Sequence, residues 1–250
     1  MRLANRPQVQ SPQGSKEQAI GFHARLASDW EAKYSSRASF KARHRLLAAL
    51  LHDAVEGGAT WLDAGCGSGH FSRQMATLGA SVTAVDGAAE MIAAAQRLGG
   101  GGGVLVYRTC GDLARLPEED ESFDGVLCSS LLEYLDEPGQ VLTEFWRVTK
   151  AGGTLIVTLP NRRALVRKAE RLLFGLTSAF RRSYPPYLAH VKVEWDRREA
   201  IALLGNAGYE ARSVTPGGLG YAPSWLGHQT FWGPLLFISA IRLPARGPHP

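Results

Sequence analysis

The chain has 250 residues, of which 45% are hydrophobic and 20% are charged, and its formal net charge is +5. These values are ordinary for a globular protein and argue against a largely disordered chain, and the length is sufficient for one α/β domain with an appendage. The excess of positive charge permits acidic partners without requiring them. Cys66, Cys110 and Cys128 have no C-x-x-C spacing, and we expect them to be reduced packing residues.

The two ends of the chain lack an apolar period. We therefore expect a disordered N-terminus over residues 1–16 and a flexible tail over residues 244–250. No N-terminal segment has the pattern of a signal peptide, and no apolar run approaches the roughly 20 residues of a membrane span. The expected location is cytoplasmic.

Residues 17–55 are expected to form a helical arm ahead of the first strand. Apolar residues recur there at helical spacing, and the polar pair Ser35-Ser36 divides the pattern into two helices. Such an arm either covers one face of the sheet or acts as a lid that closes over a ligand.

Gly65, Gly67 and Gly69 alternate after a predicted buried strand, residues 59–62, and a helix is predicted from His70 onward. Glycine at every second position allows positive φ and lets a ligand touch the backbone, and the next helix offers unpaired N–H groups. The loop therefore predicts a nucleotide cradle. His70 occupies the place where a dinucleotide-binding Gly-x-Gly-x-x-Gly needs its last glycine, which argues against a dehydrogenase.

Asp86 ends the second predicted strand, residues 81–86, at about the expected interval from the glycine loop. An acidic residue at this place in a βαβ unit can accept hydrogen bonds from both hydroxyls of a ribose. The alternation of strands and helices then continues. Further strands are expected at residues 104–109, 123–128, 154–159, 209–215 and 235–243, with helices at 71–78, 88–98, 139–148 and 196–207.

Three motifs resemble those of one enzyme family. Asp63-Ala-Gly-Cys-Gly-Ser-Gly69 resembles the first motif of the class I, Rossmann-like S-adenosylmethionine (SAM)-dependent methyltransferases that act on small molecules. Gly111-Asp-Leu with the following Leu116-Pro and Ser122-Phe-Asp resembles a second motif, and Lys150-Ala-Gly-Gly153 resembles a third. The resemblance covers roughly residues 40–243.

The resemblance implies a doubly wound α/β fold. Its core is a seven-stranded, mostly parallel sheet with one antiparallel strand, carried by a SAM-binding domain over residues 56–243. The N-terminal helical arm precedes this domain. Residues 160–195 belong to no core element and are expected to form a helical insertion over the acceptor site, after the fifth strand.

The same resemblance implies a cofactor site around the glycine loop. The backbone approach to SAM is expected from the loop residues Gly65, Cys66, Gly67 and Gly69. Asp63 is expected to orient this loop and to reach the methionyl ammonium, which the backbone carbonyl of Ser129 also faces.

The adenosyl part of SAM has its own expected partners. Asp86, followed by Gly87, takes the ribose, and Asp112 takes the adenine amino group, while Met91 and Leu113 pack on the adenine faces. Some family members also use an aromatic residue and an arginine of the leading arm on the methionyl carboxylate. Arg43 stands at the matching interval before Asp63, with Trp30 and Tyr34 upstream, although an exposed helical arginine would give the same pattern.

The acceptor side has a weaker signature. A methyl carried on a sulfonium is already activated, so the site needs alignment and exclusion of water, and no metal is expected. O-methylation of a small-molecule acceptor is preferred, and it requires a base, for which His190 is the candidate. Family members often carry histidine at the place of Tyr134, so this chain departs from the family there.

Two alternatives concern the acceptor and the activity. Residues 163–182 combine an apolar stripe with basic residues. This pattern suits peripheral contact with a membrane that holds a lipid or quinone acceptor, or a helix that packs its leucines on the acceptor pocket and leaves its arginines solvated. A non-catalytic SAM-binding scaffold is the other alternative. Tyr184-Pro-Pro-Tyr187 differs from the signature of DNA amino-methyltransferases in its first residue and its place, so no specific nucleic acid is expected.

Overall fold

The computed structural model describes residues 16–100, 102–179, 186–219 and 233–244. Its centre is one sheet, whose strands are β1 (Thr60–Ala64), β2 (Ser81–Asp86), β3 (Leu105–Thr109), β4 (Phe123–Ser129), β5 (Thr149–Pro160), β6 (Tyr209–Gly217) and β7 (Leu235–Arg242). The seven strands lie in the order β3-β2-β1-β4-β5-β7-β6, and β7 is antiparallel to both of its neighbours. The expected doubly wound fold with one antiparallel strand is confirmed.

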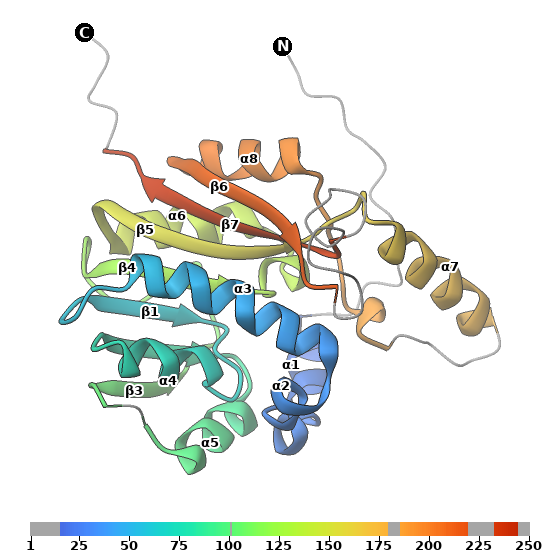
Figure 1. The fold of residues 1–250 in the computed structure, drawn as a ribbon, viewed down its shortest axis with the longest axis horizontal. Coiled ribbons are helices and arrows are strands. Elements are labelled where there is room, and N and C mark those ends of the chain that lie inside the picture. Colours follow the sequence, from blue (N-terminus) through green and yellow to red (C-terminus); the bar gives the residue numbers. More distant parts are fainter. Residues whose placement is uncertain (1–15, 101, 180–185, 220–232, 245–250) are drawn as a thin grey trace, which may run out of the picture.

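Helices cover both faces of this sheet (Figure 1). They are α1 (Lys16–Ala24), α2 (Ala32–Ser36), α3 (Ala38–Ala54), α4 (His70–Thr77), α5 (Ala89–Leu98), α6 (Pro138–Val148), α7 (Leu165–Ala179) and α8 (Arg197–Asn206), with short 3-10 turns η1 (Ala27–Asp29), η2 (Leu132–Tyr134) and η3 (Pro186–Ala189). Alternate residues of the central strands point to opposite faces, which divides the core into two layers.

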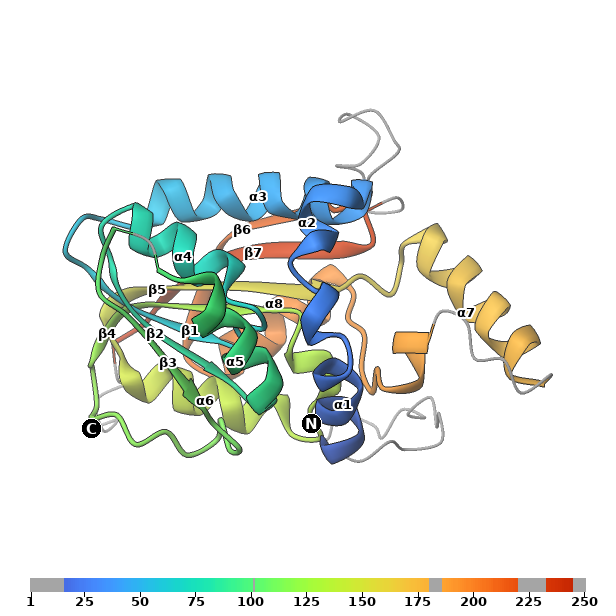
Figure 2. The same ribbon diagram turned by 90° about the horizontal axis from the view of Figure 1, so that it is seen from below.

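The two layers have different helices. Leu47 of α3 and Met75 of α4 pack with Trp61 on one face of the sheet, whereas Phe145 of α6 and Leu204 of α8 pack on the other. Figure 2 shows α3 and α6 on opposite sides of the strands. The sheet is therefore buried on both faces along its centre, as the apolar runs of β4 and β5 require.

The N-terminal arm contains one break more than expected. The expected division falls at Arg37, whose extended backbone separates α2 from α3. A second break follows α1, where the chain turns through η1 and packs Ala27 against Ala88 and Met91 of the α5 region. This packing brings the arm to the edge of the sheet at which β1 and β2 end.

The insertion after β5 forms the expected amphipathic helix, α7, which projects away from the sheet (Figures 1 and 2). The other expected helix near it, α8, begins at a capping box. The Asp196 carboxylate accepts hydrogen bonds from the backbone N–H groups of Arg198 and Glu199, and the Glu199 carboxylate accepts one from the Asp196 N–H. The expected disordered N-terminus, the start of the Tyr184-Pro-Pro turn and the flexible tail lie almost entirely outside the described residues.

Candidate active site

A cavity of about 620 Å³ opens at the carboxyl ends of β1, β2 and β4. Open α/β sheets bind ligands at this edge, where loops from neighbouring strands meet. The arm covers the cavity on one side, where Trp30 lines it. Helix α7 reaches the cavity with Arg167. The expected site residues Asp63, Gly65, Cys66, Gly67, Asp86, Gly87, Met91, Asp112, Leu113 and Ser129 also line it.

The glycine loop is fixed to the sheet by its backbone. The N–H groups of Gly65 and Cys66 donate to the carbonyl of Val85 at 2.8 and 3.0 Å. Gly69 has a φ of 75°, and a Cβ there would lie 2.3 Å from the Tyr107 hydroxyl. Gly69 does not line the cavity, so the turn and the nearby Tyr107 side chain explain why a glycine stands there. Gly65 and Gly67 do line the cavity.

Asp86 links the glycine loop to the start of α5. Its Oδ2 accepts a hydrogen bond from the Gly67 N–H at 2.9 Å, and its Oδ1 accepts one from the Ala88 N–H at 2.8 Å. Burial raises the pKa of this carboxyl, while the backbone donors act in the opposite direction. Each carboxylate oxygen has two lone pairs, so the group can still accept from a pair of ligand hydroxyls.

Asp86→Ala is expected to weaken SAM binding by about 1–3 kcal/mol, because charge-assisted hydrogen bonds to the cofactor are lost and the Gly67 N–H loses its acceptor. Isothermal titration calorimetry measures the effect. Asp53→Ala is a suitable control, since the Asp53 side chain is 81% exposed and lies outside the cavity. An unchanged affinity in a folded Asp86→Ala protein would remove the ribose assignment.

Asp63 lies behind the glycine loop and is almost fully buried. Burial raises its pKa to about 7, and the hydrogen bond from the Ser72 hydroxyl to its Oδ2, at 2.5 Å, opposes this rise. Ser72 belongs to α4, so the pair connects the end of β1 with the helix after the loop. This contact suits the expected role of Asp63 in orienting the loop.

A polar network holds the arm on the glycine loop. The carboxylate of Glu31 lies 2.7 Å from His70 Nδ1 and 2.9 Å from the Arg73 guanidinium, and it accepts a hydrogen bond from the Ser68 hydroxyl at 2.8 Å. Burial acts to raise the pKa of Glu31, but the hydrogen bonds from His70 and Ser68 and the charge of Arg73 lower it to about 2. His44 extends the network, because its Nδ1 lies 2.8 Å from His70 Nε2.

The three expected cofactor residues of the arm all line the cavity. Tyr34 stacks on His70, with ring centroids 3.8 Å apart. The Trp30 indole nitrogen lies 3.3 Å from the position that a Cβ at Gly67 would take, so the indole covers the loop. Arg43 reaches the end of β4, where it donates to the Ser129 carbonyl at 3.2 Å and hydroxyl at 2.7 Å.

The contact between Arg43 and Ser129 modifies one expectation. The Ser129 carbonyl, expected to face the methionyl ammonium, here accepts from an arginine that was expected to bind the methionyl carboxylate. Both groups therefore lie at the same end of the cavity. Arg43 Nε has no hydrogen-bond partner among the described residues, which leaves a buried donor available to an anion.

The adenosyl end of the cavity is also assembled. Met91 and Leu113 are buried and line the cavity together with Gly87. Asp112 accepts a hydrogen bond from the Ala114 N–H at 3.1 Å, and its carboxylate is exposed at the rim. These positions agree with two apolar contacts and one polar contact for a flat base.

Beyond the glycine loop the cavity continues into a polar chamber, which we define by Glu133, Tyr134, Arg167, Glu170 and Tyr187. Arg167 of α7 is buried and donates to the Tyr187 hydroxyl at 2.7 Å, and that hydroxyl donates to Glu170 at 2.7 Å. Sequence patterns did not identify Glu133, Arg167 or Tyr187 as site residues. The available signals were the place of Glu133 shortly after β4 and the expected insertion over residues 160–195, to which Arg167 and Tyr187 belong.

His190, the expected base, lies elsewhere. It does not line the cavity, and its ring packs against Phe22 with centroids 4.9 Å apart, beside Arg25 of the arm. Burial and the charge of Arg25 lower its pKa. Among the described residues, the histidine that lines the cavity is His23, whose pKa is lowered to about 4 by burial and by the charges of Lys33, His190 and Arg43. The structure therefore separates His190 from the other expected site residues.

Comparisons with known proteins agree with this geometry. The family described as "Methyltransferase domain" matches residues 62–157. A ubiquinone biosynthesis O-methyltransferase of Marinobacter nauticus is 32% identical over 210 residues, which cover 79% of this chain and 83% of that protein. A protein of the same name from Xanthomonas oryzae pv. oryzae is 42% identical over 108 residues, and this chain spans only 44% of its length.

Solved structures share the fold. Magnesium protoporphyrin IX methyltransferase from Synechocystis, solved with bound S-adenosylhomocysteine, has a TM-score of 0.66 at 17% identity, with coverage of 92% of this chain and 100% of that one. The 1,6-didemethyltoxoflavin-N1-methyltransferase of Burkholderia thailandensis has a TM-score of 0.60 at 20% identity, with coverage of 95% and 94%. At these identities the likeness concerns the fold alone.

Proposed function

The chain belongs to the class I SAM-dependent methyltransferases, and from this premise we propose that it transfers the methyl group of SAM to a hydroxyl oxygen of an apolar, aromatic small molecule. The single observation that carries the proposal is the continuity of one cavity, which runs from the glycine loop and Asp86 to the polar chamber beside α7. A cofactor and an acceptor can therefore meet in a space closed by the arm.

The residues of the cavity fit SAM, the cofactor of this family. The loop from Gly65 to Gly67 leaves room for backbone approach, and Asp86 has acceptor capacity for the ribose. The half-buried Arg43 has a buried Nε without a partner among the described residues, which is available to the methionyl carboxylate. When bound, SAM supplies an activated methyl group. The residues of the cavity have to bind SAM and the acceptor, orient the acceptor hydroxyl toward the methyl group, exclude water and accept the hydroxyl proton.

The quinone class of acceptor has two supports. Relatives at 32% to 42% identity are named ubiquinone biosynthesis O-methyltransferases. Apolar side chains from the arm and from the segment after η2, Phe22 and Leu135, also line the cavity. We therefore propose an aromatic hydroxyl on a molecule with an apolar substituent, of the kind that a quinol carries.

Transfer from methyl-labelled SAM tests this function. A catechol with a short alkyl chain is expected to gain a labelled methoxy carbon, detected by NMR, and an aniline of the same size is expected to gain none. A labelled N-methyl product without any methoxy product would contradict O-methylation. No labelled product with either acceptor would favour the non-catalytic scaffold.

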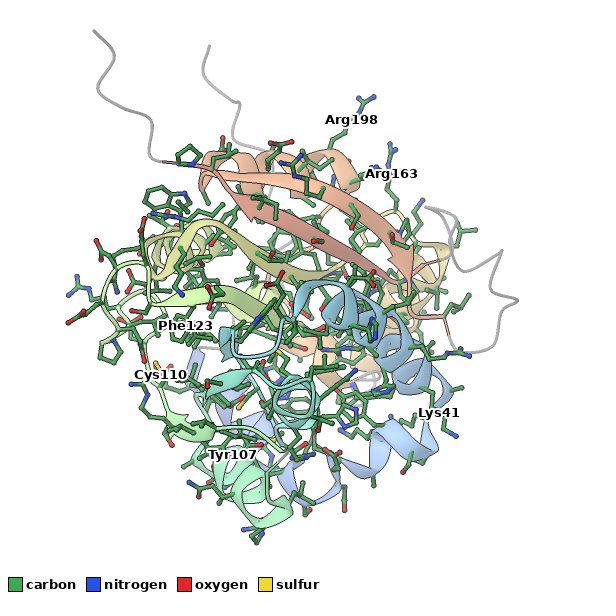
Figure 3. The ribbon with its side chains drawn as sticks, turned by 60° about the vertical axis from the view of Figure 1, so that its left-hand side comes forward. Lys41, Tyr107, Cys110, Phe123, Arg163 and Arg198 are labelled. Atoms are coloured by element: carbon green, nitrogen blue, oxygen red, sulfur yellow. The ribbon has the colours of Figure 1, made fainter. Side chains whose placement is uncertain are left out.

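Contact with a membrane surface is a second proposal, and the outer part of α7 supports it. Leu172 and Leu176 are 67% and 58% exposed. Neighbouring exposed leucines form an apolar patch, which is typical of a surface that contacts a membrane or another protein. Lys168 is exposed beside them, and Arg163 extends into solvent just before the helix (Figure 3). None of the described helices is both long and apolar enough to cross a membrane.

Not all of the basic residues of this segment are available to lipid. Arg167 is buried against Tyr187 and Glu170, and Arg171 forms an ion pair with Glu194. The remaining contribution of Arg163 and Lys168 to binding an anionic surface is about 1 kcal/mol each. Most of the affinity would therefore come from the exposed leucines, each of which gains at most about 1.5–3 kcal/mol on full burial.

Replacing both Leu172 and Leu176 with Ser is expected to abolish co-sedimentation with anionic vesicles, which the unaltered protein should show in a salt-sensitive form. The matched control is Leu98→Ser, since Leu98 is 50% exposed at the end of α5, on a different element. Equal loss in the control, or no binding of the unaltered protein to any vesicle, would remove the membrane proposal and leave a freely dissolved acceptor.

A further inference from the structure

The turn after β4 places a carboxylate inside the polar chamber. Ser130 has a φ of 51°, a left-handed conformation that is uncommon outside glycine, and its N–H donates to the Thr158 hydroxyl at 2.9 Å. The chain then enters η2, and the Glu133 carbonyl accepts a hydrogen bond from the Lys192 N–H at 2.8 Å. Hydrogen bonds from the Ser130 N–H and to the Glu133 carbonyl therefore fix the backbone on either side of this carboxylate. A left-handed conformation at a residue other than glycine, as at Ser130, is typical of functional sites.

Glu133 combines burial with an unused acceptor. The residue is 3% exposed and lines the cavity, and its Oε2 has no hydrogen-bond partner among the described residues. A buried carboxylate oxygen without a donor is costly, so such an atom calls for an explanation in function. A ligand hydroxyl that enters the chamber would supply the missing donor.

The place of Glu133 along the cavity suits a proton acceptor. Leu131, two residues before Glu133 and at the start of η2, has side-chain atoms 3.2 Å from the position of a Cβ at Gly65, so the beginning of η2 lies beside the cofactor loop. On the other side, the chamber contains Arg167 of α7. Glu133 therefore stands between the part of the cavity that fits SAM and the part that is free for an acceptor.

Other titratable groups of the cavity are less suited to this task. Burial, together with the charge of Glu133, raises the pKa of Tyr134, so its phenol stays protonated near neutral pH. Glu170 already accepts from Tyr187 and Arg167. His23 has a pKa lowered to about 4, which makes it a weak base.

We propose that Glu133 is the general base of the methyl transfer, so that the acceptor is a neutral hydroxyl whose proton must be removed at the site. This inference rests on the proposed O-methylation. The acceptor oxygen forms a bond to the methyl carbon while the sulfur–carbon bond breaks, and the electron pair of that bond stays on sulfur. The hydroxyl proton passes to Glu133 Oε2, giving the methyl ether, S-adenosylhomocysteine and a carboxylic acid that later releases its proton to water.

The surroundings of Glu133 support a base that works near neutral pH. Burial raises its pKa to about 7, and its own backbone N–H, the charges of Arg167 and Arg43 and the Ser130 hydroxyl act against this rise. The thiol of Cys128 in β4 and the phenol of Tyr134 in η2 are the other titratable groups that interact with it. A general base is most effective when its pKa is close to the working pH.

Glu133→Gln tests the proposal, since glutamine keeps the shape of the side chain and removes the charge. With an alkylcatechol at pH 7 we expect kcat to fall by about 100-fold or more, the usual contribution of a general base. The activity of the variant should then rise with pH toward the pKa of the free phenol, about 10, whereas the unaltered enzyme should level off above pH 7. With 4-nitrocatechol, whose hydroxyl is more acidic, most of the loss should disappear.

Two further measurements separate a missing base from a damaged fold. SAM affinity by calorimetry should be unchanged in Glu133→Gln. Asp63 also has a pKa of about 7 and is present in both proteins, so its carboxyl band cancels in the infrared difference spectrum between them. The carboxyl band that remains and titrates near pH 7 should come from Glu133. The control is Glu137→Gln, because Glu137 is exposed in the same segment and does not line the cavity. It should keep full activity.

The outcomes distinguish this proposal from the proposed function. Equal rates and equal pH profiles for Glu133→Gln and the unaltered enzyme would overturn the role of Glu133 and leave O-methylation intact. A loss that 4-nitrocatechol and high pH do not restore would also overturn it, because a missing base predicts both rescues. Absence of any methoxy product from the unaltered enzyme would overturn the proposed function itself.

Discussion

Gly67→Val is expected to reduce SAM affinity by more than about 100-fold and to leave a folded protein. Gly67 has a φ of 54°, where an L-residue costs roughly 1–2 kcal/mol, and a branched residue costs more. A Cβ there would lie 3.3 Å from the Trp30 indole nitrogen, so the two methyl groups of valine would need more room than the space beneath the indole offers, and the wall of the cavity beside the loop would have to shift. The Gly67 N–H would also lose its alignment with the Asp86 carboxylate.

Calorimetry with SAM measures this loss, and thermal unfolding checks the fold. Gly57→Val is the matched control, since a Cβ at Gly57 has no heavy atom within 4 Å and its φ is not in the left-handed region. The control should keep its affinity for SAM. Tight binding by a folded Gly67→Val protein would mean that the loop is only a strand-to-helix turn, and the cofactor assignment would then fail.

Phe145→Ala is expected to lower the free energy of unfolding by about 3–5 kcal/mol, the usual cost of truncating a fully buried phenylalanine. Phe145 of α6 is 0% exposed and belongs to the core layer that also contains Leu204 of α8. Its loss would leave a cavity between the helices and the sheet, far from the cofactor loop, so SAM affinity in the folded state should not change.

Urea titration measures the change, and Thr143→Ala provides a control on the same helix. Thr143 is exposed, and surface replacements of this kind usually change stability by no more than about 0.5 kcal/mol. A difference below about 1 kcal/mol between Phe145→Ala and the control would show that α6 is not packed as described.

The sheet was predictable because its signals are local. Strands β1 to β5 are apolar runs bounded by glycine, proline or charged turns, and the spacing of Gly65, Gly67 and Asp86 reflects one βαβ unit. The antiparallel strand and the identity of the cofactor residues came from the resemblance to the family. The sheet order confirms the antiparallel strand. All of the expected cofactor residues except Gly69 line the cavity.

Contacts across long sequence separations were not predictable in the same way. Glu31 and His70 are 39 residues apart, and their network depends on how the arm turns through η1. The spacing of apolar residues along the sequence does not indicate this turn. The same turn decides that His23 faces the cavity while His190 packs against the outside of the arm. Glu133 has no signature in the sequence, because a lone acidic residue in a loop becomes distinctive only when its burial is known.

A crystal structure of the protein with S-adenosylhomocysteine and an alkylcatechol tests the central claim most directly, namely that one cavity holds both cofactor and acceptor. We expect the ribose at Asp86, the homocysteine carboxylate near Arg43, and the catechol hydroxyl within hydrogen-bond distance of Glu133 and in line with the sulfur. Nucleoside density away from Asp86, or a catechol bound outside the chamber of Glu133 and Arg167, would contradict the account.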